Sequence, residues 1–230
     1  MILKLFILLQ YYINRFSLLS LPNRQATTMK NWFLFILLLP LITRGQNTIG
    51  LPDVINYPKQ SYSAGLQNWD IRQDQRGIIY IANNEGLLSF DGAFWSLYPL
   101  PNKTIVRSVA IGADHKIYVG GQDEIGYFSP DGNGRLRYHS LVNLIEPADR
   151  SFGDVWDIVP FKKDLFFRTQ YKIFRLSNGS IQSFQAPTEW SYLGMCREQL
   201  YAHDYTRGIL QYRNSRWEPI EVPNALATND

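Results

Sequence analysis

Three tryptophans and one arginine occupy one position of a sequence repeat. Trp69, Arg107, Trp156 and Trp190 each lie 10 or 11 residues before the aromatic residue of a short strand-like run. A flat aromatic face suits stacking against a sugar ring, and a guanidinium donates charged hydrogen bonds. The alternative is structural, since a tryptophan at a repeat position can also wedge between sheets and bury its ring there. The pattern therefore predicts either an aromatic ligand-binding ring or a set of packing residues.

An acidic residue follows two of these tryptophans. The triplet Trp-Asp-Ile occurs twice and places Asp70 after Trp69 and Asp157 after Trp156. Together with Arg107, both carboxylates could bind the hydroxyl groups of a ligand. They are also the paired carboxylates that a glycosidase or lyase would need. Because alternate residues of a strand face opposite ways, the carboxylates would point toward the neighbouring sheet if the tryptophans point into an interface.

Two polar loops add hydrogen-bonding groups to this candidate site. Residues 83–85 and 122–124 follow corresponding strands of the first two repeat units. We expect both loops at the same end of the fold, where their amide and carboxylate groups can bind hydroxyls; ordinary surface turns are the alternative. The ligand-binding candidates in these loops are Asn84, Glu85, Gln122 and Asp123.

Residues for catalysis or metal binding are sparse. The three histidines, His115, His139 and His203, are scattered along the chain, and Cys196 is the only cysteine. Neither set has the spacing of metal ligands, and a single cysteine allows no internal disulfide. The sequence therefore predicts no catalytic residue, no metal site and no cofactor.

A repeat of about 40 residues organises most of the chain. The strand-like run Ile79–Ala82 recurs at 117–120, 165–168 and 200–203, with its aromatic residues 38, 48 and 35 positions apart. A turn signal that begins with Asp or Asn follows each run. Four short strands with tight connections, repeated in tandem, are typical of β-propeller blades. The sequence therefore predicts an all-β propeller with about four blades of four antiparallel strands. The expected blades lie at about 67–100, 104–141, 154–186 and 190–222.

Two segments fall outside the regular repeat. Residues 141–152 form an insertion between the second and third units, with room for a short amphipathic helix around 141–145. Residues 46–66 precede the first unit, and we expect an extended segment that could add one edge strand. Most propellers close with more than four blades, so we expect the N-terminal portion of a longer, incomplete ring.

The first 45 residues have the composition of a targeting segment. A Met-Lys pair precedes an eleven-residue apolar run at 32–42, and small residues follow it. This pattern predicts a cleavable signal peptide at 29–45 and export to the periplasm or the cell exterior; an uncleaved anchor is the alternative. We interpret residues 1–28 as an upstream over-extension ahead of a true start at Met29, in preference to a two-helix anchor.

Charge separates this leader from the body of the chain. The chain has 23 lysines and arginines and 20 acidic residues, but five of the cations and none of the acids precede Gln46. The body therefore holds 18 cations against 20 acids, a formal charge of −2. It has no basic excess that could neutralise phosphates, so we expect no nucleic acid as a partner.

The first two repeat units carry motifs of a known family. The motifs are Tyr57-Pro58-Lys59, Gln67-Asn68-Trp69-Asp70-Ile71, Asn83-Asn84-Glu85-Gly86-Leu87-Leu88, Phe90-Asp91-Gly92 and the run from Ile117 to Phe128. They resemble the periplasmic sensor propellers of Bacteroidetes two-component regulators that carry a triple-tyrosine domain. The resemblance covers roughly residues 50–217, and part of it, the Gly-Leu-x-x-Phe-Asp-Gly pattern, is shared by other propellers.

This resemblance implies an extracytoplasmic ligand-sensing domain of a regulator. The ligand would be an oligosaccharide or another small molecule derived from a glycan. Family members continue into a triple-tyrosine domain, a membrane helix and a histidine kinase or LuxR-type output module, so the C-terminal sensor and output domains would be partners that this chain lacks. Two other functions stay open at this point, a protein-binding scaffold and a secreted lyase or glycosidase.

Overall fold

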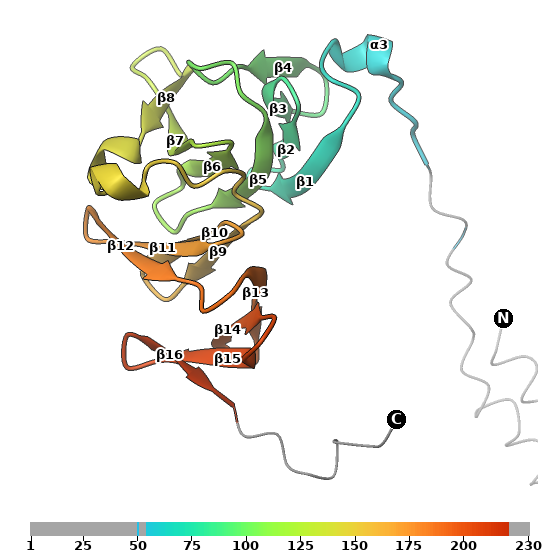
Figure 1. Ribbon diagram of the computed structural model, residues 1–230. Coiled ribbons are helices and arrows are strands. Elements are labelled where there is room, and N and C mark those ends of the chain that lie inside the picture. The colour runs from blue at the N-terminus through green and yellow to red at the C-terminus, as the bar shows by residue number, and fades with distance from the viewer. Residues whose placement is uncertain (1–49, 51–53, 221–230) are drawn as a thin grey trace, which may run out of the picture. The chain divides into compact units, whose positions relative to one another are not determined.

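The computed structural model of the chain describes Gly50 and residues 54–220. Within that part, the secondary structure is almost entirely antiparallel β-sheet, arranged as four separate sheets of four strands. Figure 1 shows these sheets following one another in chain order. The expected signal peptide at 29–45 and the extension at 1–28 lie outside the described residues.

Each sheet is a meander of strands that are consecutive in sequence, as a propeller blade requires. The first blade contains β1 (Asn68–Gln73), β2 (Ile79–Asn83), β3 (Gly86–Phe90) and β4 (Trp95–Tyr98), and the second contains β5 (Val106–Ile111), β6 (Ile117–Gly121), β7 (Ile125–Pro130) and β8 (Leu136–Ser140). The third contains β9 (Asp157–Phe161), β10 (Asp164–Arg168), β11 (Lys172–Ser177) and β12 (Ser180–Gln185), and the fourth contains β13 (Trp190–Cys196), β14 (Gln199–Asp204), β15 (Gly208–Arg213) and β16 (Arg216–Pro219). The predicted fold class is confirmed.

The blades meet through their innermost strands, with β5 beside β1, β9 beside β5, and β13 beside β9. In the described part of the chain this series stays open, because β13 makes no comparable contact with β1. The arrangement is that of an incomplete propeller, in agreement with the expectation from the repeat number.

The hairpins between the first two strands of the blades differ in length. Five residues, 74–78 and 112–116, connect these strands in the first and second blades. Only two residues connect them in the third and fourth blades, Lys162-Lys163 and Arg197-Glu198. Lys162, Arg197 and Glu198 have positive φ angles, as two-residue hairpin turns require. Because of this difference, the number of residues that separates two equivalent positions on the first and second strands is not the same in every blade.

In the first, second and fourth blades, the innermost strand has a β-bulge near its start. The pairing of β1 with β2 shifts at Trp69, which is left as an extra residue between two ladder pairs. Arg107 of β5 and Ser191 of β13 are the extra residues at the same point of their strands. Trp156 directly precedes β9 in the third blade. Such bulges re-aim a side chain out of the regular alternation.

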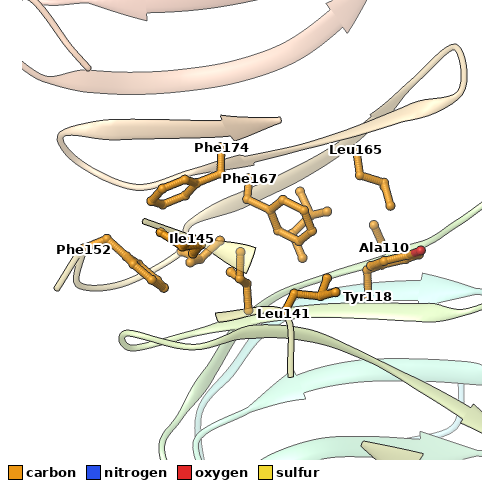
Figure 2. Close-up of a cluster of buried hydrophobic side chains, with 11 residues drawn as sticks. Ala110, Tyr118, Leu141, Ile145, Phe152, Leu165, Phe167 and Phe174 are labelled. Carbon is orange, nitrogen blue, oxygen red and sulfur yellow. The ribbon is translucent and has the colours of Figure 1, made fainter. Parts of the chain in front are cut away.

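Apolar side chains fill the space between successive blades. The core between the second and third blades contains Tyr118, Phe167 and Phe174, and the insertion contributes Leu141 and Phe152 to it (Figure 2). Equivalent cores lie between the first and second blades and between the third and fourth. Each middle blade is therefore covered on both faces, which explains why its second strand contains a continuous apolar run.

The described part of the segment before the first blade, residues 54–67, does not add an edge strand. It contains the single-turn helix α3 (Lys59–Tyr62), and no strand is found within residues 54–67. Its aromatic side chains pack on the outer strand of the first blade, since the rings of Tyr57 and Tyr62 lie 5.4 and 5.6 Å from that of Trp95. Pro58 is the N-cap of this helix.

The insertion between the second and third blades forms two short 3-10 helices, Val142–Leu144 and Pro147–Asp149, in place of an amphipathic α-helix. Pro147 starts the second of them, and its ring would have interrupted a continuous α-helix. Among the described residues, none of the helices combines the length and the apolar character needed to cross a bilayer.

Candidate functional site

The innermost strands of all four blades begin at the same end of the described structure. Antiparallel pairing places Asn68 at the start of β1 beside Asn83 at the end of β2, and the same relation holds in the other blades. The turns between the second and third strands lie at this end as well. We call it the loop rim; it comprises the turns 84–85, 122–124, 169–171 and 205–207 together with Trp69, Arg107 and Trp156.

Side chains from three different blades meet at the loop rim. The guanidinium carbon of Arg107 lies 4.0 Å from the ring centre of Trp69 and 4.9 Å from that of Trp156. The two indole rings are 6.1 Å apart and inclined at 77° to each other. A cation over an aromatic face contributes about 0.5–2 kcal/mol. Both tryptophans remain 40% exposed, so this aromatic cluster offers two partly open rings around a fixed cation.

Asp154 holds Arg107 in this position. The Nε atom and a terminal nitrogen of Arg107 lie 3.2 and 3.1 Å from Asp154 Oδ2. The second carboxylate oxygen, Oδ1, is buried and has no hydrogen-bond partner within the described structure. The ion pair therefore neutralises the cation of the aromatic cluster and leaves one acceptor without a donor.

The turn between β2 and β3 contributes Asn84 to the aromatic cluster. The indole N–H of Trp69 donates a 2.7 Å hydrogen bond to Asn84 Oδ1, and the Asn84 amide donates in turn to Gln67 Oε1 at 3.0 Å. Asn83 beneath them is fully buried, and its side chain hydrogen-bonds to the backbone of the segment before β1. Glu85 is exposed on the same turn. Asn83 thus fixes the turn, and Asn84 orients the Trp69 ring.

The turn between β6 and β7 reaches the same cluster through Asp154. Gln122 is exposed and forms an isolated β-bridge with Asp154. Asp123 Oδ1 accepts hydrogen bonds from the backbone N–H groups of Phe152 and Gly153, at 2.6 and 2.7 Å. Asp123 therefore shapes the connection that carries Asp154. The loops 83–85 and 122–124 both lie at the loop rim, beside Trp69 and Arg107 respectively.

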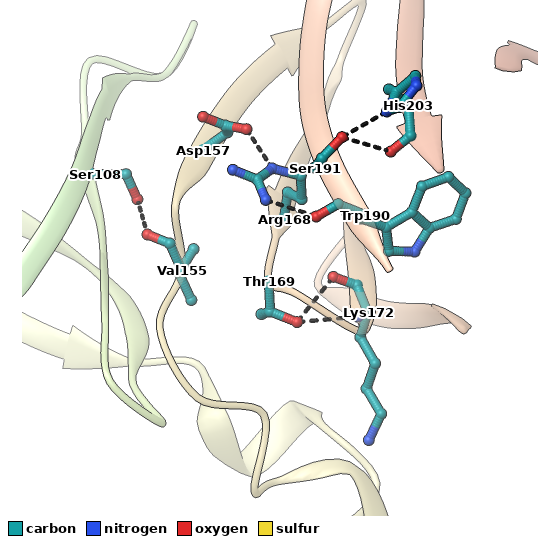
Figure 3. A network of polar contacts seen from close by, with 9 residues as sticks. All are labelled: Ser108, Val155, Asp157, Arg168, Thr169, Lys172, Trp190, Ser191 and His203. Atoms are coloured by element: carbon teal, nitrogen blue, oxygen red, sulfur yellow. Dashed lines mark hydrogen bonds and ion pairs between the residues drawn. The ribbon is translucent and has the colours of Figure 1, made fainter. Parts of the chain in front are cut away.

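The two aspartates of the Trp-Asp-Ile triplets link neighbouring blades. Asp70 Oδ2 accepts a 3.1 Å hydrogen bond from the backbone N–H of Val109 in the second blade. Asp157 forms an ion pair with Arg168, and Arg168 donates a 2.8 Å hydrogen bond to the backbone oxygen of Trp190 in the fourth blade (Figure 3). Both carboxylates are thus engaged in contacts that hold the blades together.

The structure corrects the repeat position of Trp190. It lies one residue before the bulged Ser191 and therefore corresponds to Val106, a buried residue of the second blade. Trp190 is only 2% exposed, and its ring lies 5.6 Å from that of Trp217 in the core between the third and fourth blades. The error arises from hairpin length, because counting 11 residues back from Tyr201 overshoots when the turn is shorter. Trp190 is thus a packing residue.

The fourth blade instead presents Ser191 at the rim position, a residue that the sequence analysis missed. Its hydroxyl lies 2.6 Å from Nδ1 of His203 (Figure 3). Asp154 was missed as well, because it precedes Trp156 in an irregular connection and belongs to no repeated motif. An alignment of the four repeat units that allowed for the shorter hairpin of the fourth blade would have placed Ser191 beside Trp69 and Arg107. No sequence signal marks Asp154.

A groove of about 530 Å³ adjoins the aromatic cluster. It runs between the connection 151–156 and the turn 169–171, and both Asp154 and Trp156 line it. Its volume falls within the range of small-molecule sites. Trp156 therefore belongs to both the groove and the aromatic cluster, and Asp154 connects the groove to Arg107 of the cluster. We treat the two as one candidate site.

A larger groove, of about 640 Å³, lies between the first two blades at the opposite end. Four of its charged residues are paired within their own hairpin turns, Arg76 with Asp74 at 2.9 Å and Lys116 with Asp114 at 3.0 Å. The fifth, Asp91, accepts hydrogen bonds from the backbone N–H groups of Ala93 and Phe94 in its own turn. Burial by itself would raise the pKa of Asp74, but hydrogen bonds from the Arg76 side chain and from backbone N–H groups lower that pKa below its ordinary value. These charges close turns, so the loop rim is the stronger candidate site.

The fold is similar to several solved structures. The extracellular domain of a hybrid two component system from B. thetaiotaomicron covers 73% of this chain with a TM-score of 0.53 and 21% identity. The extracellular domain of a second such system from the same organism covers 67%, with a TM-score of 0.51 and 14% identity. Virginiamycin B lyase from Staphylococcus aureus covers 68%, with a TM-score of 0.53 and 16% identity.

These similarities establish the β-propeller fold. The chain spans 23% and 22% of the two regulator domains and 56% of the lyase. The regulator domains belong to the kind of protein that the sequence motifs resemble. The sequence itself matches no protein-family model and no curated protein.

Proposed function

We propose that this chain is part of an extracytoplasmic propeller that binds a glycan fragment and reports it to a signal-transduction regulator. The observation that carries the proposal is the aromatic cluster, in which Trp69 and Trp156 from two different blades flank Arg107. A sugar site needs a flat apolar face for the ring carbons and polar groups nearby for the hydroxyls. The two partly exposed rings supply the face, and Asn84 and Gln122 lie close enough to the cluster to supply polar groups.

Two further observations support a sensor role. The motifs of the first two blades resemble those of regulator sensor propellers, and the extracellular domains of two hybrid two component systems share the fold. The predicted signal peptide would export the chain to the compartment in which such a sensor works. A propeller glycosidase is less well supported, because Asp70 and Asp157 are both engaged in links between blades.

A glycan-binding screen of the chain, followed by calorimetric titration of its best ligand, tests the proposal. We expect Trp69→Ala and Trp156→Ala each to weaken binding at least tenfold, which corresponds to about 1.4 kcal/mol. Because both rings are partly exposed, the melting temperature should fall by only a few degrees.

Phe94→Ala is the matched control, since it removes an exposed aromatic ring from the opposite end of the first blade. Binding and melting temperature should both stay as in the unaltered chain. A screen without any bound glycan would reject the proposal, and so would a ligand whose affinity both tryptophan substitutions leave unchanged.

A further inference from the structure

We propose that the site takes a neutral oligosaccharide, bound as an extended chain that runs from the aromatic cluster into the groove between 151–156 and 169–171. This inference rests on the proposed function and specifies its ligand. The starting observation is that Asp154 and Trp156 both line the groove, while Trp156 belongs to the aromatic cluster and Asp154 is paired with its arginine. A sugar stacked on Trp156 therefore has the groove as its continuation.

A second aromatic side chain lies in the groove. Tyr171 belongs to the turn between β10 and β11 and is 48% exposed. Its position is set by a 2.7 Å hydrogen bond from the backbone N–H of Ala186 to its backbone oxygen, and its hydroxyl lies 3.4 Å from Glu189. Tyr171 thus offers a second stacking face, separate from that of Trp156. Two faces along one groove fit a ligand of more than one sugar unit.

The charges of the groove favour a neutral ligand. Among the described residues that line it, the charged ones are Asp154 and Lys172. Asp154 is paired with Arg107, and the Lys172 ammonium lies 2.9 Å from Asp149. A uronate or sulfate would have to shed its hydration without meeting an unpaired cation, which costs free energy. The hydroxyl of a neutral sugar costs much less free energy to desolvate than such an ion does.

The unpaired oxygen of Asp154 fits the same ligand. Asp154 Oδ1 is buried without a donor, a state that costs free energy as long as no hydrogen bond is made. A sugar hydroxyl in the groove could donate to this oxygen after a small movement of the side chain. A carboxylate or sulfate has no proton to donate and would be repelled there.

Two series of oligosaccharides test the inference, neutral hexose chains and oligogalacturonates of one to six units each. For the neutral series, we expect the affinity of the protein for the oligosaccharide to rise at least tenfold from one sugar unit to three and then to level off. Oligogalacturonates of the same length should bind at least tenfold more weakly. Tyr171→Ala should abolish the gain with length but keep the affinity for one unit, whereas Tyr171→Phe should preserve the gain because its ring remains.

The outcomes separate this inference from the proposed function. Equal affinity for one and three units, tighter binding of the uronates, or an unchanged gain in Tyr171→Ala would overturn the inference and leave glycan binding intact. At least tenfold weaker binding of every chain length in Trp156→Ala, together with loss of the length-dependent gain in Tyr171→Ala, would support both. If neither series binds and a full glycan screen is also negative, the proposed function itself is wrong. Phe94→Ala should behave as the unaltered chain throughout.

Discussion

The side chain of Ser108 donates a 2.7 Å hydrogen bond to the backbone oxygen of Val155 and thereby joins the inner strand of the second blade to the start of the third. Ser108 is fully buried. Asp70 and Arg168 make the corresponding links at the other two boundaries between blades. A polar contact therefore accompanies the apolar core at each boundary, and it fixes how the inner strand of one blade is aligned along the inner strand of the next.

Removal of the Ser108 hydroxyl should destabilise the protein. Ser108→Ala leaves the Val155 oxygen buried without this donor, so we expect a loss of about 1–2 kcal/mol in the free energy of unfolding, measured by urea denaturation. Ser96→Ala on the outer strand β4 is the control, because Ser96 is exposed. Equal stability of the two variants would show that the link contributes nothing.

A methyl group at Gly120 should have a similar effect through crowding. A Cβ atom at this position would overlap the side chain of Val155 and press on the Ser108 hydroxyl. We expect Gly120→Ala to cost about 1–3 kcal/mol in thermal unfolding experiments. Gly132→Ala in an open turn has no neighbouring atom to meet and should leave the melting temperature nearly unchanged. If the two variants melt alike, the blades are less tightly apposed at Gly120 than the structure indicates.

The two kinds of tryptophan should respond differently to truncation. Trp190 is buried in the core between the third and fourth blades, so Trp190→Ala should lower the free energy of unfolding by about 3–5 kcal/mol. Trp156 is 40% exposed, and Trp156→Ala should cost only about 1 kcal/mol. Chemical denaturation of both variants checks the difference. A larger loss for Trp156 would place that residue among the packing tryptophans.

Asp204 should make stability depend on acid pH. Burial alone would raise the pKa of Asp204, but hydrogen bonds from backbone N–H groups of Thr188, Thr206 and Arg207 and from the Thr206 hydroxyl hold that pKa well below its ordinary value. The carboxylate therefore stabilises the fold above its unfolded-state pKa of about 3.9, and this contribution is lost as the pH falls toward the lower folded-state pKa.

Asp204→Asn should accordingly be less stable than the unaltered chain at pH 7, by about 1–3 kcal/mol, and the gap should narrow between pH 5 and pH 2. Urea denaturation across this pH range measures it. Glu198→Gln, at an exposed turn, should show no comparable gap. A gap for Asp204→Asn that stays constant with pH would mean that the charge of Asp204 is not what stabilises the connection.

The strands and turns of the blades could be predicted because they depend on neighbouring residues. Continuous apolar runs and turn residues such as Asn178-Gly179 are local signals, and the tandem repeat made the blade architecture readable. The short helix at Lys59–Tyr62 in place of a strand had no comparable signal in the sequence.

The candidate site was only partly predictable. Trp69, Arg107 and Trp156 were found because all three occupy one repeat position. That position depends on hairpin length and on a bulge, and the two-residue turn Arg197-Glu198 misdirected the count to Trp190 in the fourth blade. The pairing of Arg107 with Asp154 joins residues 47 positions apart, and nothing in the local sequence around either residue indicates it.

The bulges at Trp69, Arg107 and Ser191 carry side chains that lie outside the regular pairing of the sheet. Each bulged residue stands between two ladder pairs and has no partner of its own on the neighbouring strand. The neighbouring residue on the strand carries the link to the next blade in the first two cases. The side chain at each of these three positions can therefore change during evolution while the sheet keeps its pairing. Related chains could acquire new surface chemistry at this end by substitutions at the bulged positions alone.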